Sequence, residues 1–169
     1  GLPNRRLLDQ HLSKMQETMS DDMGLAILSI DLDRFKQIND TLGHRAGDAT
    51  LCHFASALRS NAPKEGFIGR VGGDEFVVVM PCDGNLDILA ELAKRIINAA
   101  NQPLNFEGQV CRFGASIGIA CTPDNDVEYA SLLVRSDIAL YRAKQDGRNC
   151  YSFFTDELQT SIVESRELA

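Results

Sequence analysis

Apolar positions along this chain of 169 residues follow two different spacings. Four stretches place apolar residues three or four positions apart, which is typical of helices that bury one face. Between them lie short runs of apolar and β-branched residues, which are typical of buried strands. The first spacing predicts helices that bury Leu8, Leu12, Met15 and Met19, then Leu51, Phe54, Ala55 and Leu58, then Leu89, Leu92, Ala93, Ile96 and Ala100, and a last helix over residues 129–145.

Strands are predicted over residues 25–31, 67–71, 75–81, 110–121 and 151–154. The second and third flank Gly72-Gly73, and a glycine pair between two short apolar runs is a strong signal for a β-hairpin. Residues 40–47 are expected to form a loop, and the polar stretch 156–169 to lead out of the domain. This order of elements predicts an α/β sandwich, in which helices cover a mixed, mainly antiparallel sheet.

The composition agrees with one globular domain. Hydrophobic residues make up 44% and charged residues 24% of the chain, so it can bury a core of ordinary size. The net charge of −7 argues against binding to DNA or RNA, which requires a basic face. A nucleotide substrate is still compatible with an acidic chain, because a bound divalent cation supplies positive charge locally. No apolar run approaches the ~20 residues that span a bilayer, so we expect no membrane contact by this domain.

The five cysteines are scattered and include no C-x-x-C pair; they are Cys52, Cys82, Cys111, Cys121 and Cys150. An odd number without regular spacing predicts neither a disulfide framework nor a zinc site. Reduced thiols and a cytoplasmic location are therefore expected. Because the sequence begins at Gly1 without an initiating methionine, we expect a longer parent protein, either free or attached to a membrane.

Three carboxylates stand at the predicted ends of strands. Asp31 follows a strongly apolar run, and Asp74 and Glu75 lie in the Gly-Gly hairpin. If that strand and the hairpin are neighbours, the three acids converge on one edge, where Mg²⁺ could bind together with substrate phosphates. Metal-assisted phosphoryl transfer is then the reaction class that the residues favour. The residues alone leave open a simpler interpretation, in which the acids and glycines only mark a tight turn.

The hairpin sequence Arg70-Val71-Gly72-Gly73-Asp74-Glu75-Phe76 resembles the signature of the GGDEF family, the diguanylate cyclases. Further segments resemble the family in the same order, namely residues 1–6, 31–40, 43–48, 116–120 and 139–149. This resemblance extends to Phe153. It assigns residues 1–154 to the GGDEF domain and residues 155–169 to a connector helix, similar to the one that often precedes an EAL phosphodiesterase domain.

The resemblance implies a ferredoxin-like, palm-type fold, similar to adenylate cyclase catalytic domains. The implied reaction condenses two GTP molecules into cyclic di-GMP and releases two pyrophosphates, in bacterial second-messenger signalling. Each domain would hold one GTP, so a second copy of the domain is required in a homodimer, permanent or transient. An alternative from the same family is a GTP-binding regulatory domain that controls a fused phosphodiesterase without cyclase activity. A domain that serves only for dimerisation is a third possibility.

The resemblance also implies a metal site for Mg²⁺ or Mn²⁺. Its ligands would be the side chains of Asp31 and Asp74 and the backbone carbonyl of Leu32. Glu75 would bind a second metal or contact the substrate. Asp74 or Glu75 would help to deprotonate the attacking 3′-hydroxyl group.

Asn39 and Asp48 correspond to the residues that bind guanine in the family. A carboxylate accepts hydrogen bonds from guanine N1–H and N2–H₂, which adenine does not offer in that arrangement. Taken without the family, Asn39 would be a loop-capping residue and Asp48 a residue in the first turn of a helix. His44 corresponds to a substrate contact, or is simply solvated or capping.

The backbone amide of Phe35 and the cations Lys36, Lys144 and Arg148 correspond to the groups around the triphosphate. Gly72 and Gly73 would let phosphate approach the backbone closely. Lys144 and Arg148 could instead interact only with the dipole at a helix C-terminus. Arg70 is expected to be structural, anchoring the hairpin.

The sequence departs from the fuller family pattern at one place. Many members carry an Arg-x-x-Asp motif for product inhibition, which ends five residues before the first glycine of the signature. That window holds Pro63-Lys64-Glu65-Gly66 in this chain, so both the Arg and the Asp are absent. We therefore predict no inhibition by cyclic di-GMP through this primary site.

Overall fold

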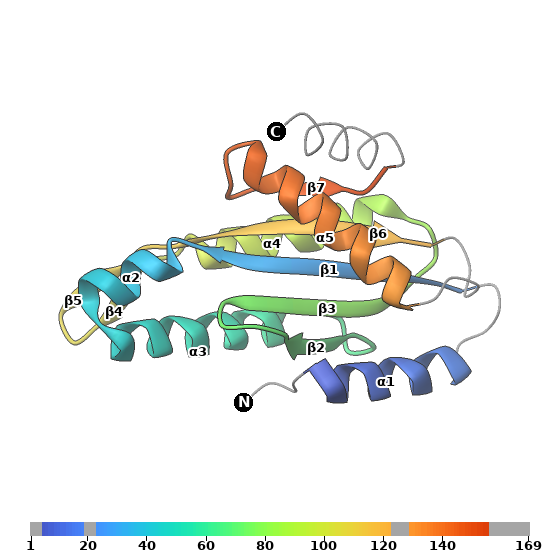
Figure 1. Ribbon diagram of the computed structural model, residues 1–169, viewed down its shortest axis with the longest axis horizontal. Coiled ribbons are helices and arrows are strands. Elements are labelled where there is room, and N and C mark those ends of the chain that lie inside the picture. The colour runs from blue at the N-terminus through green and yellow to red at the C-terminus, as the bar shows by residue number, and fades with distance from the viewer. Residues whose placement is uncertain (1–4, 19–22, 123–128, 156–169) are drawn as a thin grey trace.

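The computed structural model describes residues 5–18, 23–122 and 129–155. A five-stranded sheet in the order β2-β3-β1-β6-β7 forms its centre (Figure 1). Its strands are β1 (Gly24–Asp33), β2 (Phe67–Arg70), β3 (Glu75–Cys82), β6 (Gly114–Cys121) and β7 (Tyr151–Phe153). The helices are α1 (Arg5–Thr18), α2 (Phe35–Leu42), α3 (His44–Asn61), α4 (Leu86–Ala100) and α5 (Tyr129–Gln145), and a separate small hairpin consists of β4 (Leu104–Phe106) and β5 (Gln109–Cys111).

The long strand β1 lies in the middle of the sheet and determines its arrangement. It pairs antiparallel with β3 on one side and with β6 on the other, whereas β7 joins β6 in parallel. All ten residues of β1 are buried, which explains why its sequence is almost continuously apolar until its charged end. The mixed, mainly antiparallel sheet that the sequence predicts is confirmed.

The two faces of the sheet are covered by different helices. The side chains of Ala26, Leu28 and Ile30 pack with α3 and α4, whereas Leu25 and Ile27 pack with α1 and α5. Figure 1 shows α5 crossing in front of β1 and α4 lying behind the sheet. Successive side chains of a strand point to opposite faces. The odd-numbered positions of β1 therefore face α5, and this face leads to the charged residues at the end of the strand.

The prediction of a loop over residues 40–47 is wrong, because α2 and α3 fill this segment with only Gly43 between them. Ile38 is buried in α2, and Phe35 and Leu42 pack against the same core. These three positions form one apolar stripe in an eight-residue helix, which is too short and too polar for a clear period. Gly43 ends α2 with φ of 97°, a conformation that favours glycine.

The predicted strand over residues 110–121 is also wrong in its extent. It consists of β5 and β6, and β5 pairs with β4, which the sequence analysis missed. Strands of three residues are too short to show an alternating pattern. The predictions for Met19 and for the connector over residues 155–169 concern segments that lie outside the described residues, apart from Thr155.

All five cysteines lie within the described residues, and each is a free thiol. Within the described ranges, no helix combines the length and the apolar character that crossing a membrane requires.

Candidate active site

Three carboxylates meet at the edge where β1 and the β2–β3 hairpin end. Asp31 of β1 lies opposite Glu75 of β3 in the antiparallel register, and Asp74 is the last residue of the turn before β3. The backbone N–H of Leu32 donates to the carbonyl of Asp74 at 3.1 Å, which joins the turn to β1. One carboxylate oxygen from each acid lies within 4.8 Å of the others. The predicted convergence of Asp31, Asp74 and Glu75 is therefore present.

The tip of the hairpin is held by Arg70, the last residue of β2. Its Nε donates to the carbonyls of Gly72 and Gly73, at 3.1 Å each, and its Nη2 donates to Gly73 at 2.6 Å. The N–H of Val71 also donates to the carbonyl of Glu75 at 3.0 Å. Gly73 is exposed, and open space surrounds its α-carbon. The structural role predicted for Arg70 is confirmed, and the open space at Gly73 leaves room for a close approach of phosphate.

Two properties of the acidic edge favour binding of a metal cation. Burial, and after it the neighbouring carboxylate of Asp31, together raise the pKa of Asp74 from 3.8 to about 6. Oδ1 of Asp31 is buried and accepts no hydrogen bond from the described residues. A buried carboxylate oxygen without a donor is costly, and a divalent cation would satisfy it. The side chains therefore fit Mg²⁺ or Mn²⁺, whereas the role of the Leu32 carbonyl as a ligand remains a prediction.

Lys144 brings positive charge to this edge. It lies in the last turn of α5, and its Nζ forms an ion pair with Oδ2 of Asp31. The side chain of Asp31 is 12% exposed and that of Lys144 is 30% exposed, so the pair is only partly screened by solvent. An interaction with the dipole of α5 alone therefore does not account for Lys144, because its ammonium group contacts Asp31, a candidate metal ligand, directly.

Asn39 and Asp48 are brought to one corner by the packing of α2 against α3. A Cβ atom placed on Gly47 would lie 1.8 Å from Oδ1 of Asn39, so the amide group rests against the glycine backbone. Asp48 follows Gly47 directly and is exposed. It is the fifth residue of α3 and thus lies beyond the first turn, where the simpler interpretation had placed it. His44 is the first residue of α3 and is exposed, and its contact with substrate remains a prediction.

The N-terminus of α2 offers unpaired backbone donors. Arg34 precedes the helix in the left-handed conformation, with φ of 69°, and supplies no side-chain cap. The first main-chain bond of the helix runs from the N–H of Ile38 to the carbonyl of Arg34, at 3.0 Å. The amides of Phe35 and Lys36 therefore have no partner within the helix, as is usual for a first turn, and can bind an anion. The side chain of Lys36 is exposed beside them.

Arg148 lies beyond the end of α5, and its Nη1 atom is 3.8 Å from Oδ1 of Asp33. No role for Asp33 follows from the motifs in the sequence, although its carboxylate is 5% exposed and hydrogen-bonded in the structure. Its position could have indicated a place near the site, because Asp33 is two residues after Asp31 and so lies on the same face of β1.

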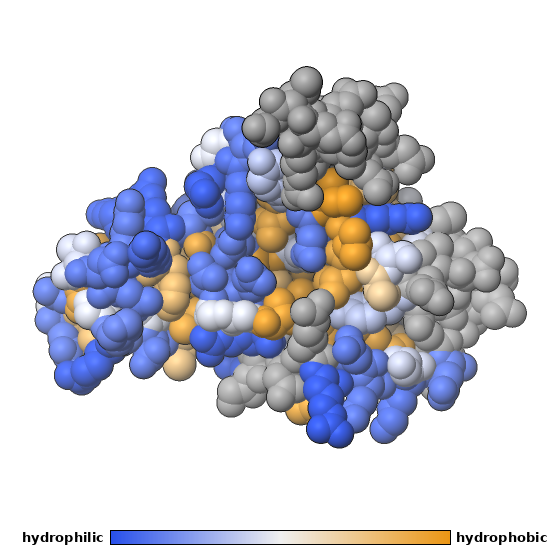
Figure 2. Space-filling model, in the orientation of Figure 1, coloured by the Kyte–Doolittle hydropathy of each residue, from blue (hydrophilic) through white to orange (hydrophobic). Residues whose placement is uncertain are grey.

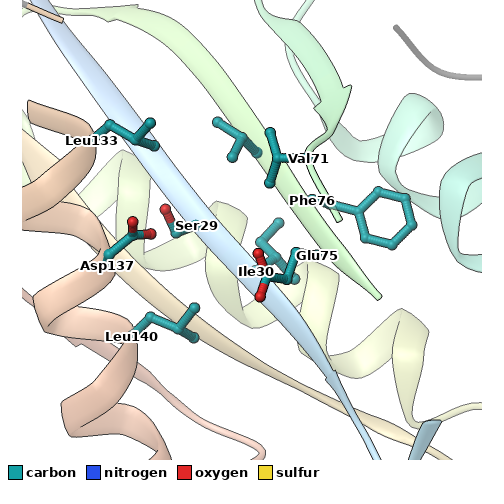
Figure 3. Close-up of a pocket in the computed structure, with 9 residues that line it drawn as sticks. Ser29, Ile30, Val71, Glu75, Phe76, Leu133, Asp137 and Leu140 are labelled. Carbon is teal, nitrogen blue, oxygen red and sulfur yellow. The ribbon is translucent and has the colours of Figure 1, made fainter. Parts of the chain in front are cut away.

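A small pocket lies beside Glu75, between the hairpin and α5. Figure 3 shows Ser29 of β1, Glu75 of β3 and Asp137 and Leu140 of α5 among its lining residues. Its volume is about 70 Å³, whereas drug-sized ligands occupy pockets of roughly 300–1,000 Å³. This pocket is therefore too small to enclose a nucleotide. On the face shown in Figure 2, the end that carries α2 is covered mainly by hydrophilic residues, which suits an open polar site.

The comparisons with known proteins agree with this fold and acidic edge. The family profile described as "Diguanylate cyclase, GGDEF domain" matches residues 1–150. An uncharacterized signaling protein of Caulobacter vibrioides is 41% identical over 171 residues, covering 100% of this chain and 21% of the relative. The bifunctional diguanylate cyclase/cyclic di-GMP phosphodiesterase MucR of Pseudomonas aeruginosa is 38% identical over 168 residues, covering 99% of this chain and 24% of MucR.

Solved structures give the same result. The GGDEF domain of TpbB from Pseudomonas aeruginosa superposes with a TM-score of 0.85 at 32% identity, covering 95% of each chain. The GGDEF domain of DgcB from Caulobacter crescentus, solved in complex with c-di-GMP, superposes with a TM-score of 0.82 at 27% identity, covering 90% of this chain and 91% of that one. An α/β sandwich with an acidic hairpin at one sheet edge defines the class of domain to which this fold belongs. Within that class, the chain belongs to the GGDEF family of diguanylate cyclases.

Proposed function

We propose that this domain is a diguanylate cyclase, which condenses two GTP molecules into cyclic di-GMP and releases two pyrophosphates. The observation that carries this proposal is the convergence of Asp31, Asp74 and Glu75, with one oxygen from each within 4.8 Å, in a member of the GGDEF family. A domain that served only for dimerisation would gain nothing from the cost of burying and clustering these charges. The free thiols are compatible with a reaction in the cytoplasm.

The three acids and the carbonyl of Leu32 would have separate roles in metal binding and catalysis. Asp31 and Asp74 would hold Mg²⁺ or Mn²⁺, together with the carbonyl of Leu32, and Glu75 would bind a second ion or the substrate. A bound ion would make the 3′-hydroxyl more acidic and offset charge on the phosphoryl group.

Substrate recognition would come from the neighbouring elements. Asn39 and Asp48 would bind guanine, with His44 as a further contact at the same end. The amide of Phe35 and the side chains of Lys36, Lys144 and Arg148 would hold the triphosphate, near the half-buried Gly72 and the exposed Gly73. Charge-assisted hydrogen bonds of this kind are about twice as strong as neutral ones.

The reaction requires two copies of the domain. Each copy would hold one GTP on an open edge, and the 3′-hydroxyl on one copy would attack the α-phosphate on the other. An open edge beside a pocket of only about 70 Å³ supports this arrangement. The chain spans 15–24% of the length of the first curated relatives that it matches. Segments outside it would therefore bring the two copies together in the parent protein.

The test is a turnover assay on the domain fused to a dimeric coiled coil. GTP is supplied with Mg²⁺ or Mn²⁺, and cyclic di-GMP and pyrophosphate are both measured. We expect one cyclic di-GMP for every two pyrophosphates, no product from Asp74→Ala, and normal turnover by Glu91→Gln, which removes an exposed acid on α4. Tight GTP binding without product in the dimerised protein would reject cyclase activity and favour the regulatory alternative. Absence of GTP binding would reject both.

A further inference from the structure

Asp33 is a buried carboxylate with defined partners and no part in the chemistry proposed above. Its side chain is 5% exposed. Oδ1 accepts a hydrogen bond from the hydroxyl of Ser116 on β6 at 2.8 Å, and Oδ2 accepts one from the backbone N–H of Asn149 at 2.8 Å. The same N–H lies 3.2 Å from Oγ of Ser116. Asp33 therefore connects β1 and β6 to the segment that follows α5.

That segment has an unusual backbone. Gly147, Arg148 and Asn149 are all left-handed, with φ of 117°, 66° and 52°. The N–H groups of Gly147 and Arg148 donate to the carbonyls of Lys144 and Ala143, the paired bonds of a Schellman motif that ends α5. The left-handed conformation is disfavoured at non-glycine residues, although asparagine tolerates it better than most, so contacts beyond the helix are expected to stabilise the pair Arg148–Asn149. The hydrogen bond to the buried carboxylate supplies such a contact, since Asn149 N–H lies beyond the Schellman bonds.

Space for this arrangement is provided by Gly114, which lies opposite Asp33 in the β1–β6 register. A Cβ atom at this position would lie 2.6 Å from Oδ1 of Asn149 and 3.3 Å from Oδ2 of Asp33. A larger residue would push aside the side-chain amide of Asn149 and crowd the carboxylate of Asp33. Asp33, Ser116 and Gly114 thus together form the surface on which the turn at residues 147–149 rests.

We propose that Asp33 is a positioning residue, which holds this left-handed turn so that the guanidinium of Arg148 is directed to the triphosphate of GTP. This inference rests on the proposed function, because it assigns Arg148 to the phosphates. The direction in which GTP affinity changes when Asp33 is neutralised distinguishes positioning from a purely electrostatic effect. The Asp33 charge lies 3.8 Å from Arg148 Nη1 and opposes anion binding there. If charge were its main effect, neutralising Asp33 would tighten GTP binding, whereas loss of positioning weakens it.

The first experiment compares ligands with and without phosphates. Asp33→Asn is expected to weaken GTP binding roughly tenfold, because a charge-assisted hydrogen bond is replaced by a neutral and partly mismatched one. Guanosine binding, measured by NMR titration, should change less than about twofold, since guanine is held at Asn39 and Asp48. In a double-mutant cycle, adding Asp33→Asn to Arg148→Ala should cause little further loss of GTP affinity. Additive losses, or tighter GTP binding by Asp33→Asn, would overturn the proposal.

The second experiment does not depend on any ligand. Amide hydrogen exchange at Asn149 should accelerate about tenfold or more in Asp33→Asn, with little change at Phe154, whose N–H donates to Ile119 at 2.7 Å in the same sheet. Unchanged exchange at Asn149 would also overturn the proposal. If Asp33→Asn fails to fold, Ser116→Ala decides the matter, because it removes one hydrogen bond to the same carboxylate and should weaken GTP binding in the same direction. Wild-type protein that binds no GTP would instead reject the proposed function, and this assignment of Arg148 with it.

Discussion

The ammonium group of Lys144 on α5 forms an ion pair with the carboxylate of Asp31 on β1, the first of the three acids at the candidate metal site. The lysine therefore partly neutralises the carboxylate that a metal ion would need. To reach a phosphate, Lys144 would have to leave Asp31, and a cation would have to replace it there. Binding of the metal and binding of the triphosphate should consequently favour one another.

Replacing Lys144 should therefore change the two affinities in opposite directions. We expect Lys144→Gln to bind Mn²⁺ about fivefold more tightly in the absence of nucleotide, because a competing ion pair worth ~1 kcal/mol is removed. The same variant should bind GTP more weakly. Electron paramagnetic resonance of free Mn²⁺ measures the first affinity, and calorimetry the second. Lys94→Gln, on the exposed face of α4, is the matched control. Weaker Mn²⁺ binding by Lys144→Gln would contradict this competition.

The raised pKa of Asp74 predicts a pH-dependent cost to the metal-free fold. Its pKa is about 6 in the folded protein, above the usual 3.8, so the ionised form is disfavoured on folding. The resulting destabilisation is complete above about pH 6 and fades as the pH falls toward 3.8. Asp74→Asn should thus raise the melting temperature of the metal-free protein at pH 7.5, on the order of a few degrees. The difference between variant and wild type should shrink at pH 4.5. A constant difference at both pH values would show that ionisation is not its cause.

Gly47→Ala should separate stability from substrate binding. The new Cβ would collide with the amide oxygen of Asn39, the end of a flexible side chain that can rotate away. The free energy of unfolding should consequently change by less than about 1 kcal/mol, since alanine is also the better helix former. GTP affinity should fall roughly tenfold, because Asn39 leaves the guanine corner. The variant combined with Asn39→Ala should bind GTP no more weakly than Asn39→Ala alone. A further loss in the combined variant would mean that Gly47 acts independently of Asn39.

Arg70→Lys tests whether the hydrogen bonds of Arg70 to Gly72 and Gly73 position the hairpin turn. An ammonium group cannot reproduce the three hydrogen bonds that the guanidinium makes to the carbonyls of Gly72 and Gly73. Turnover should fall about tenfold because Asp74 and Glu75 are less well placed. Melting temperature should change little, since the side chain is exposed. Equal turnover in variant and wild type would show that the tip is held without Arg70.

If the domain is active as proposed, cyclic di-GMP should not inhibit it through residues 63–66. The segment is a turn in which Gly66 N–H donates to the carbonyl of Pro63 at 2.9 Å, and it offers neither the Arg nor the Asp of the inhibitory motif. Initial rates at increasing product concentration test this expectation. Inhibition that disappears in Lys64→Ala or Glu65→Ala would disprove it, whereas inhibition unaffected by both changes would arise at another surface.

The layers of the fold and the acidic hairpin could be predicted from the amino-acid sequence alone. Long apolar periods carry that information locally, which is why α4, α5 and β1 could be predicted from spacing. The helix α2 was not predicted because three apolar positions in eight residues are too few to show a helical spacing. They are recognised as one face only because they pack against the core. The β4–β5 hairpin is likewise too short to signal itself.

The different environments of the acids on β1 become visible only in the folded protein. Asp31 and Asp33 lie on the same face of β1, two residues apart, and nothing in their local sequence distinguishes their roles. Their neighbours do: Asp31 lies beside the hairpin acids and Lys144, whereas Asp33 lies beside Ser116 and the backbone of Asn149. These partners are more than 40 residues away along the chain. The environment of a carboxylate is set by such distant contacts, so it emerges only when the strands are paired and α5 is packed across them.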